Sequence, residues 1–145
     1  MNYYKKTENL LNDYVKIKSE IDNLQIEIED IKLEYKGVGA MSYEEKSTPT
    51  NAFNSNVENE IINKEKLLEK LNYKLNKKIR LIKKIDNAIN ILNDTEKKVI
   101  KMKCFEGLQY KQIGQVLNID HNYACEVKRK AINKIIDLVF IKEKL

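Results

Sequence analysis

Apolar side chains recur along the first quarter of the chain with the spacing of a long amphipathic helix. They follow one another in alternating steps of four and three residues, with charged side chains between them. A period of 3.5 residues keeps one seam facing a partner helix and implies a left-handed supercoil. The pattern predicts a helix over about residues 3–35, with the seam residues Leu10, Tyr14, Ile17, Ile21, Leu24, Ile28, Ile31 and Tyr35.

A second seam with the same spacing predicts a helix over about residues 56–92. Lys64 and Lys78 stand at seam positions, where a charge restricts register or strand number. The sequence leaves two arrangements open: the two helices fold back as an antiparallel hairpin, or like helices pair across a homodimer. A second apolar row widens the face and suggests more than one neighbouring helix; it includes Ile62, Leu67, Ile79, Leu81 and Ile91.

Periodicity is absent from residues 36–55, between the two seams. This segment contains Gly37, Gly39 and Pro49 among several Ser, Thr and Asn residues, so it is predicted to be a loop. Loops of this length are often functional or mobile.

The last part of the chain, residues 94–145, reads as three shorter helices separated by turn residues. Asp94 or Thr95 is expected to cap the first of them, which runs to about Phe105. Gly107 follows where a helix commonly ends in the left-handed conformation.

A second short helix is predicted over about residues 110–117. Asn118-Ile119 forms the following turn, since Asn adopts the left-handed conformation at little cost and Ile119 can fill the core. Asp120 is the expected N-cap of a third helix over about residues 121–139. Gly114 lies where a larger side chain would hold two crossing helices apart. The second helix is expected to bury Ile113, Val116 and Leu117.

The last two helices have helix-turn-helix spacing, which most often presents a helix to the DNA major groove. At the start of the third helix, Asn122 can pair with adenine and Glu126 can accept from cytosine N4. Basic side chains further along are suited to phosphates. The candidate DNA-binding residues are His121, Asn122, Tyr123, Cys125, Glu126, Lys128, Arg129 and Lys130 of the third helix, with Lys111 and Gln112 of the second.

Some of these side chains have a second interpretation. His121 also suits a solvated first turn, and Tyr123 can pack beside Tyr110. Cys125 either packs or faces the groove, whereas Cys104 is expected in the core.

Residues 92–136 resemble region 4 of sigma-70-type transcription factors, about 45 residues and under a third of the chain. The resemblance implies a helix-turn-helix that binds promoter DNA and RNA polymerase. It departs from primary sigma factors at the start of the third helix, where their arginines are replaced by residues 121–126, so the usual −35 preference is not carried over. The matching positions are Gly107, Leu108, Ile113, Gly114, Leu117, Ile119, Val127, Ala131, Lys134 and Ile135.

The whole layout is also similar to small phage regulators of the RinA/ArpU type. That resemblance implies a transcriptional activator of late phage genes that acts with host RNA polymerase. No segment resembles sigma region 2, which argues against a complete sigma factor.

Charge is uneven along the chain. Residues 94–145 carry 11 basic and 7 acidic side chains, and residues 1–93 carry 16 and 15, which together give the net charge of +5. Residues 70–84 hold seven basic side chains and no acid, and two interpretations stay open: pairing with acids of the first helix, or a stripe that contacts phosphates. The seven are Lys70, Lys74, Lys77, Lys78, Arg80, Lys83 and Lys84.

The sequence offers little for other function classes. Two cysteines and one histidine are too few for a zinc cluster, so no metal or cofactor is expected. An enzyme is not expected, because no glycine-rich phosphate loop or catalytic cluster is present. The N-terminus lacks a signal peptide and no apolar run reaches the length of a membrane span, so we expect a cytoplasmic protein of a bacterial host cell.

These observations predict an all-α protein: a helical coiled-coil hairpin or arm over residues 1–93, followed by a helix-turn-helix module over residues 94–145. The expected function is sequence-specific binding of double-stranded DNA in transcription regulation, with RNA polymerase as a further partner. The protein is expected to form a homo-oligomer, and a dimer is favoured. Two alternatives stay open: an adaptor that binds polymerase without reading DNA, and a phage small terminase subunit.

Overall fold

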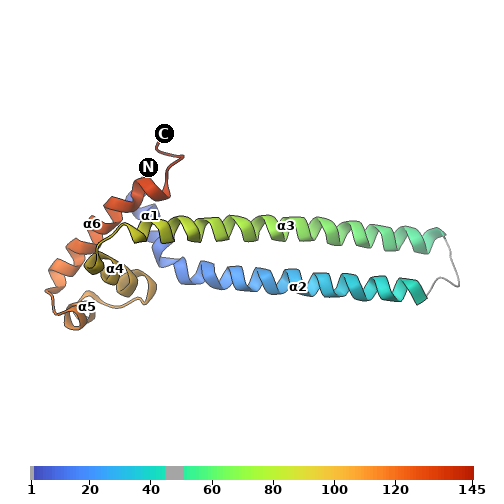
Figure 1. Cartoon of the computed structure of the whole chain (residues 1–145), viewed down its shortest axis with the longest axis horizontal. Coiled ribbons are helices and arrows are strands. Elements are labelled where there is room, and N and C mark those ends of the chain that lie inside the picture. The colour runs from blue at the N-terminus through green and yellow to red at the C-terminus, as the bar shows by residue number, and fades with distance from the viewer. Residues whose placement is uncertain (1, 45–50) are drawn as a thin grey trace. The chain divides into compact units, whose positions relative to one another are not determined.

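A computed structural model of the chain describes residues 2–44 and 51–145, and the side chains of residues 2–34 and 56–145. All regular elements in these residues are helices, so the all-α prediction is confirmed (Figure 1). In chain order they are α1 (Tyr3–Asn12), α2 (Tyr14–Glu44), α3 (Asn51–Asn90), α4 (Asp94–Ile100), the π-helix η1 (Lys101–Phe105), α5 (Tyr110–Leu117) and α6 (His121–Val139).

The helices group into two compact units. The terminal unit contains Met1–Lys18 and Arg80–Leu145, and the middle unit contains Ser19–Ile79. The sequence suggested a single boundary near residue 93 instead. The difference arises because α1 packs against α6 and η1, so that both ends of the chain share one core.

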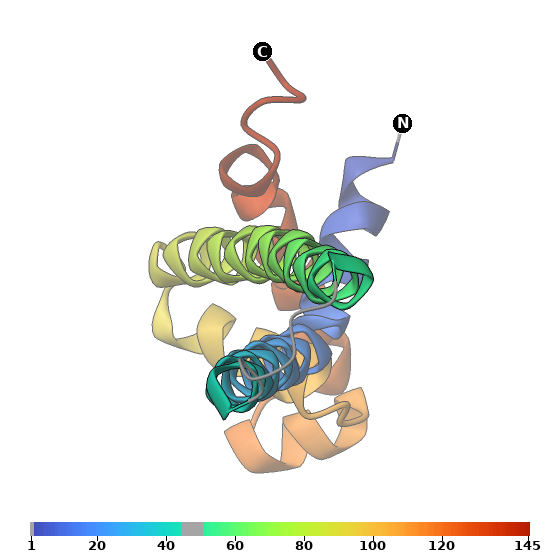
Figure 2. The ribbon, with the colours of Figure 1, turned by 90° about the vertical axis from the view of Figure 1, so that its right-hand side faces the viewer.

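In the middle unit, α2 and α3 lie side by side and antiparallel (Figures 1 and 2). Lys78 forms an ion pair with Glu20, and Lys64 Nζ lies 4.0 Å from Glu34 Oε2. The residue number rises on one helix as it falls on the other, so these two pairs fix an antiparallel register. Of the two arrangements that the sequence left open, the chain therefore adopts the intramolecular hairpin.

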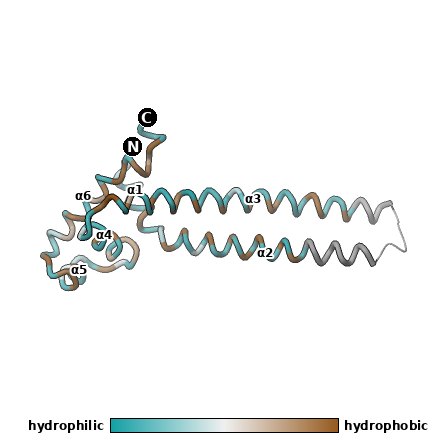
Figure 3. Tube along the Cα trace, viewed as in Figure 1, coloured by the Kyte–Doolittle hydropathy of each residue, from teal (hydrophilic) through white to brown (hydrophobic). Residues whose placement is uncertain are grey.

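The hairpin buries a single seam. Ile28 and Ile31 are buried and the remaining seam side chains of the described middle unit are half-buried. Apolar segments recur along both helices (Figure 3). The second apolar row of α3 is not covered within the described chain, since Ile62 is 47% and Leu67 45% exposed. Ile79 and Ile91 are exposed as well, and Leu81 is half-buried.

Two helix boundaries differ from the sequence-based prediction. α2 continues to Glu44 and α3 begins at Asn51, so both helices extend into the predicted loop 36–55, of which residues 45–50 lie outside the described residues. The helix expected over residues 3–35 is interrupted at Asp13. The seam spacing continues unchanged through this residue, which is why the pattern did not reveal the interruption.

The terminal unit has a core built from its two chain segments. Val99, Ile113, Ala124 and Val127 form a buried cluster from α4, α5 and α6. Leu11 of α1 is also fully buried in this unit. Partly buried side chains that pack on the cluster are Met102, Leu108, Tyr110, Leu117 and Ile119. Ring contacts join further parts of this unit: Tyr14 stacks on Phe105 with centroids 4.2 Å apart, and Tyr3 meets Phe140 at 5.5 Å.

The N-cap of α4 is Asn93, where Asp94 or Thr95 was expected. The Glu96 amide donates to the Asn93 side chain at 2.8 Å, and the Asn93 amide donates to the Glu96 carboxylate at 3.1 Å. This reciprocal pair is a capping box, which satisfies two backbone N–H groups at once. After η1, Gly107 has φ +71°, which confirms the predicted left-handed residue.

Candidate nucleic-acid interface

The turn between α5 and α6 is fixed by backbone geometry. Asn118 has φ 57° and ψ 47°, which confirms the left-handed conformation predicted for it. A Cβ on Gly114 would lie 2.7 Å from the carbonyl oxygen of Ile119, so this position excludes a side chain. The expectation for Val116 was wrong: it is 64% exposed, and α5 turns Ile113 and Gly114 inward instead.

The start of α6 follows the prediction. The backbone N–H of Asn122 donates to the Asp120 carboxylate at 3.2 Å, so Asp120 caps the helix. α6 then places one side in the core of the terminal unit along its whole length. Its buried residues are Ala124, Val127, Lys128, Ala131, Ile132, Ile135, Ile136 and Val139.

The opposite side of α6 is exposed and polar. Residues on it recur in steps of three and four, as one face of an α-helix requires. No described ion pair includes Glu126, Arg129 or Lys130. We call this surface the outer face of α6; it consists of Asn122, Glu126, Arg129, Lys130 and Asn133.

Asn133 was not among the sequence candidates. It lies four residues after Arg129 and three after Lys130, so helical periodicity alone could have added it once the exposed face was known. An asparagine can pair bidentately with adenine, as Asn122 can.

Tyr123 lies at one margin of the outer face and is 52% exposed. It lines a pocket of about 190 Å³ between the beginning of α4 and α6. Glu126 and Lys130 line the same pocket, so this hollow is continuous with the outer face. The other lining residues are Asn93, Thr95, Glu96, Val127 and Lys134. His121 precedes this region and is exposed, with Nδ1 3.6 Å from Asp120 Oδ1.

The two cysteines have different environments. Cys125 is exposed at the other margin of the outer face, whereas Cys104 is buried in η1. Burial raises the pKa of the Cys104 thiol to about 11, so this thiol is un-ionised at neutral pH. The expectation of Cys104 in the core is confirmed, and of the two alternatives for Cys125 the structure shows exposure.

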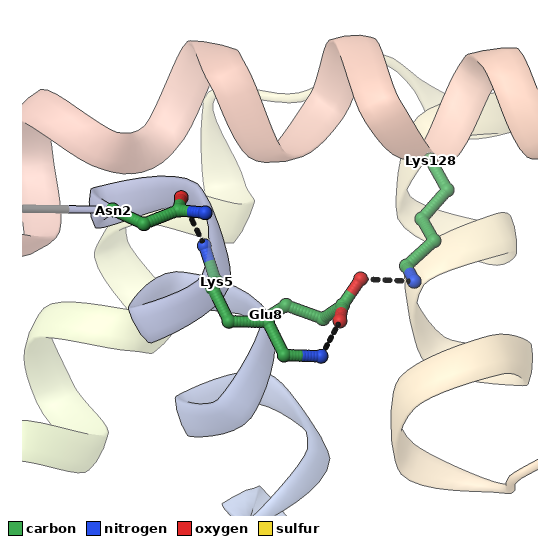
Figure 4. A network of polar contacts seen from close by, with 4 residues as sticks. All are labelled: Asn2, Lys5, Glu8 and Lys128. Carbon is green, nitrogen blue, oxygen red and sulfur yellow. Dashed lines mark hydrogen bonds and ion pairs between the residues drawn. The ribbon is translucent and has the colours of Figure 1, made fainter.

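Lys128 does not lie on the outer face, which corrects its assignment as a phosphate contact. Only 10% of its side chain is exposed, and its Nζ lies 2.7 Å from a carboxylate oxygen of Glu8 in α1 (Figure 4). The other oxygen of Glu8 accepts from Lys5 at 3.0 Å. An inward lysine needs a carboxylate partner because burying an unpaired charge is costly. That partner is 120 residues away in the sequence.

The Glu8–Lys128 pair shifts the ionisation of both groups. The hydrogen bond from Lys128 lowers the pKa of Glu8, against the effect of burial. Burial would lower the pKa of Lys128, but the hydrogen bond and charge of Glu8 outweigh it and raise that pKa. Burial raises the pKa of Tyr110, which also faces Lys128. At neutral pH the pair is therefore ionised and joins α1 to α6.

The two candidates on α5 are both exposed, but only one of their side chains has a described hydrogen-bond partner. Lys111 takes part in no described ion pair or hydrogen bond, whereas the Gln112 side chain accepts from the Gln109 amide at 3.0 Å. Gln112 therefore serves as part of the capping box of α5, and Lys111 remains available to a phosphate.

A second ion pair supports α6 from α4. Lys134 Nζ lies 2.8 Å from the buried carboxylate of Glu96. Burial of Glu96 opposes its ionisation, but Lys134 and the Asn93 amide outweigh this effect and lower its pKa. Glu96 thus caps α4 and holds α6 with the same carboxylate.

With this geometry in view, the comparisons place the chain in a family. A family model described as "Protein of unknown function (DUF722)" matches residues 3–137. The chain belongs to the DUF722 family. The DUF722 match begins at α1 and extends into α6, so it includes both partners of the Glu8–Lys128 pair. No curated protein and no solved structure matches the chain.

Two further properties concern the described residues of this DUF722 member. None of their helices is both long and apolar enough to cross a membrane. They also contain no group of three or more His, Cys, Asp or Glu side chains placed to hold a metal ion.

Proposed function

We propose that α5, the turn at Asn118 and α6 act as a helix-turn-helix that reads double-stranded DNA, and that the protein regulates transcription. The observation that carries this proposal is the outer face of α6, where Asn122, Glu126, Arg129 and Lys130 are exposed while the opposite face holds the helix in the core. A reading helix needs this division, because its contacts must reach base edges without unpacking the domain.

The roles of the side chains follow from their chemistry. Asn122 and Asn133 suit adenine, and Glu126 suits cytosine. Lys130, Arg129 and Lys111 suit phosphates, which position the protein without reading sequence. The similarity to RinA/ArpU-type regulators supports the narrower proposal of a phage-type activator of late genes that acts with host RNA polymerase.

A selection from random duplexes tests the proposal. Asn122→Ala should change the selected sequence, with a loss of about 1–3 kcal/mol at one adenine. Asn87→Ala, an exposed asparagine of α3, is the matched control and should select the parent sequence. If Asn122→Ala and the parent bind every duplex alike, α6 does not read DNA.

A second candidate is an adaptor that binds RNA polymerase without reading DNA. The inward position of Lys128 favours it, since the outer face of α6 then carries only two cations beside Glu126. Capture of polymerase by the purified protein, together with no duplex binding in about 50 mM salt where phosphate contacts are strong, would select the adaptor.

We also propose that the protein forms a homodimer through the middle unit. The exposure of Ile62 and Leu67 supports this, because the described chain leaves the apolar surface of both side chains uncovered. Solution mass from light scattering tests it, and a ring-sized mass would instead favour a small terminase subunit.

A further inference from the structure

The lysines of α3 in the middle unit fall into two groups with different surroundings. Lys64 and Lys78 lie on the side toward α2 and each pairs with one of its acids, Glu34 and Glu20. The other described lysines of α3 within the middle unit point away from α2 and take part in no described ion pair. They are Lys66, Lys70, Lys74 and Lys77.

These four lysines share one face of the helix with an exposed tyrosine. Lys66, Lys70, Tyr73, Lys74 and Lys77 follow the spacing of zero, four, seven, eight and eleven residues, which places them on one side of an α-helix. Tyr73 is 66% exposed, and Lys77 Nζ lies 5.7 Å from its ring centroid. We call these five residues the basic face of α3.

The basic face is unfavourable for the isolated helix. Like charges three or four residues apart destabilise a helix by about 0.2–0.5 kcal/mol for each pair, and this face contains three such pairs, 66 with 70, 70 with 74, and 74 with 77. Acids of α2 could have relieved them, yet among the described side chains Lys78 alone of the seven cations between residues 70 and 84 is paired with an acid of α2. Pairing with the acids of the first helix therefore does not account for this run.

A polyanion relieves these repulsions and matches the shape of the face. The distance from Lys66 to Lys77 along the helix is roughly 17 Å at 1.5 Å per residue, which corresponds to about five phosphates along one DNA strand. Lysine ammonium groups and a tyrosine hydroxyl are both common partners of phosphate oxygens.

We propose that the basic face of α3 binds the phosphate backbone of double-stranded DNA without reading its sequence. This inference rests on the proposed function, because it adds a second contact to a protein whose α6 reads DNA. The middle unit then contributes affinity and not sequence preference.

The test uses the full chain and a random-sequence duplex of about 40 base pairs, long enough for sequence-independent binding. Lys70→Gln/Lys74→Gln/Lys77→Gln is compared with the parent and with Lys16→Gln/Lys32→Gln/Lys142→Gln, a control that removes three exposed lysines elsewhere. Glutamine keeps helix propensity close to that of lysine, so the helix is retained.

The slope of log Kobs against log salt is negative, and each phosphate contact adds about 0.9 to its magnitude. The basic-face variant should therefore reduce the magnitude of the slope by between about 2 and 3, and the control should leave it within about 0.5 of the parent. An equal slope for the parent and the basic-face variant overturns the inference. The inference is also overturned if the parent binds no duplex. It is overturned as well if the basic-face variant binds the duplex as the parent does but no longer captures RNA polymerase.

Asn122→Ala, measured alongside, separates this inference from the proposed function. If Asn122→Ala changes sequence preference while the basic-face variant keeps the parent slope, the inference fails and the reading role of α6 stands. If the magnitude of the slope falls in the basic-face variant while Asn122→Ala binds all sequences as the parent does, the basic face binds DNA and α6 is not the reader.

Discussion

The ion-paired lysines of the terminal unit and the basic face of the middle unit place lysine in opposite environments. In the terminal unit, Lys128 turns inward and is matched by a carboxylate from another helix, and Lys134 is likewise matched by the buried Glu96. In the middle unit, the lysines of the basic face point outward and have no described acidic partner. The first arrangement holds helices together, and the second leaves charge available to a partner.

The two units also differ in how completely they bury their apolar side chains. The terminal unit buries several isoleucines completely, among them Ile113, Ile132 and Ile135, whereas among the described side chains of the middle unit only Ile28 and Ile31 are buried. Because burial of apolar surface is the main stabilising contribution to folding, the terminal unit is expected to define the stability of the protein. The middle unit is expected to tolerate change and to serve binding.

The largest expected effect tests this difference in the core. Ile113→Ala should lower the free energy of unfolding by about 2–5 kcal/mol, because a fully buried side chain leaves a cavity. Leu71→Ala, at a half-buried seam position of the middle unit, should cost less than about 2 kcal/mol. Urea unfolding of both variants measures this, and equal losses would remove the distinction between the units.

The Glu8–Lys128 pair gives the next largest effect. Lys128→Met leaves Glu8 with only the exposed Lys5 as a partner and should lower stability by about 3 kcal/mol. Lys130→Met, two residues further on the exposed face, should change it by less than about 0.5 kcal/mol. The double variant Glu8→Gln/Lys128→Met should recover most of the loss. Equal effects of the two single variants would show that Lys128 faces solvent.

The turn between α5 and α6 should respond to a single methyl group. Gly114→Ala brings a Cβ to 2.7 Å from the Ile119 carbonyl oxygen, so it should cost about 1–3 kcal/mol and displace α6. Gly107→Ala meets no atom within 4 Å but keeps φ +71°, which should cost about 1 kcal/mol. For Gly114→Ala, DNA affinity should fall by more than the loss of thermal stability explains, because α6 is displaced. If the loss of affinity follows the loss of stability in the same way in Gly107→Ala and Gly114→Ala, this expectation is contradicted.

The smallest effect is the dependence of stability on pH. The pKa of both Glu8 and Glu96 is lowered below the usual 4.5 in the folded protein. Their stabilisation is therefore complete above the unfolded pKa and is lost as pH falls through the lowered folded pKa. Glu8→Gln should reduce the loss of stability between neutral and acidic pH. If the stability of Glu8→Gln falls with acidification as steeply as that of the parent, the Glu8–Lys128 pair does not contribute to the pH dependence of stability.

Most local features were predictable from the sequence, although the N-cap of α4 was missed; contacts between distant residues were not predictable. Asn118, Asp120 and Gly107 were assigned correctly because a turn or cap depends on neighbouring residues only. The outward exposure of Asn122 and Glu126 followed from helical periodicity. Lys128 was assigned wrongly, because its position in the helix does not reveal a carboxylate that α1 supplies.

Helix ends and the hairpin show the same limit. Gly37 and Gly39 suggested a loop, yet α2 continues to Glu44, since propensity is a weak guide when a helix has a neighbour to pack against. The pairing of α2 with α3 depends on contacts between distant residues, such as Lys64 with Glu34, which spacing along one helix cannot specify.

Alkylation of Cys125 tests the central claim, that the exposed side of α6 meets DNA, most directly. Cys125 is exposed beside the outer face, and Cys104, buried with its pKa raised to about 11, is an internal control. A saturating duplex from the selection should slow maleimide modification of Cys125 by about tenfold or more, as expected when a DNA interface covers a thiol, and should leave Cys104 unreactive. An unchanged rate at Cys125 with DNA bound would contradict the account.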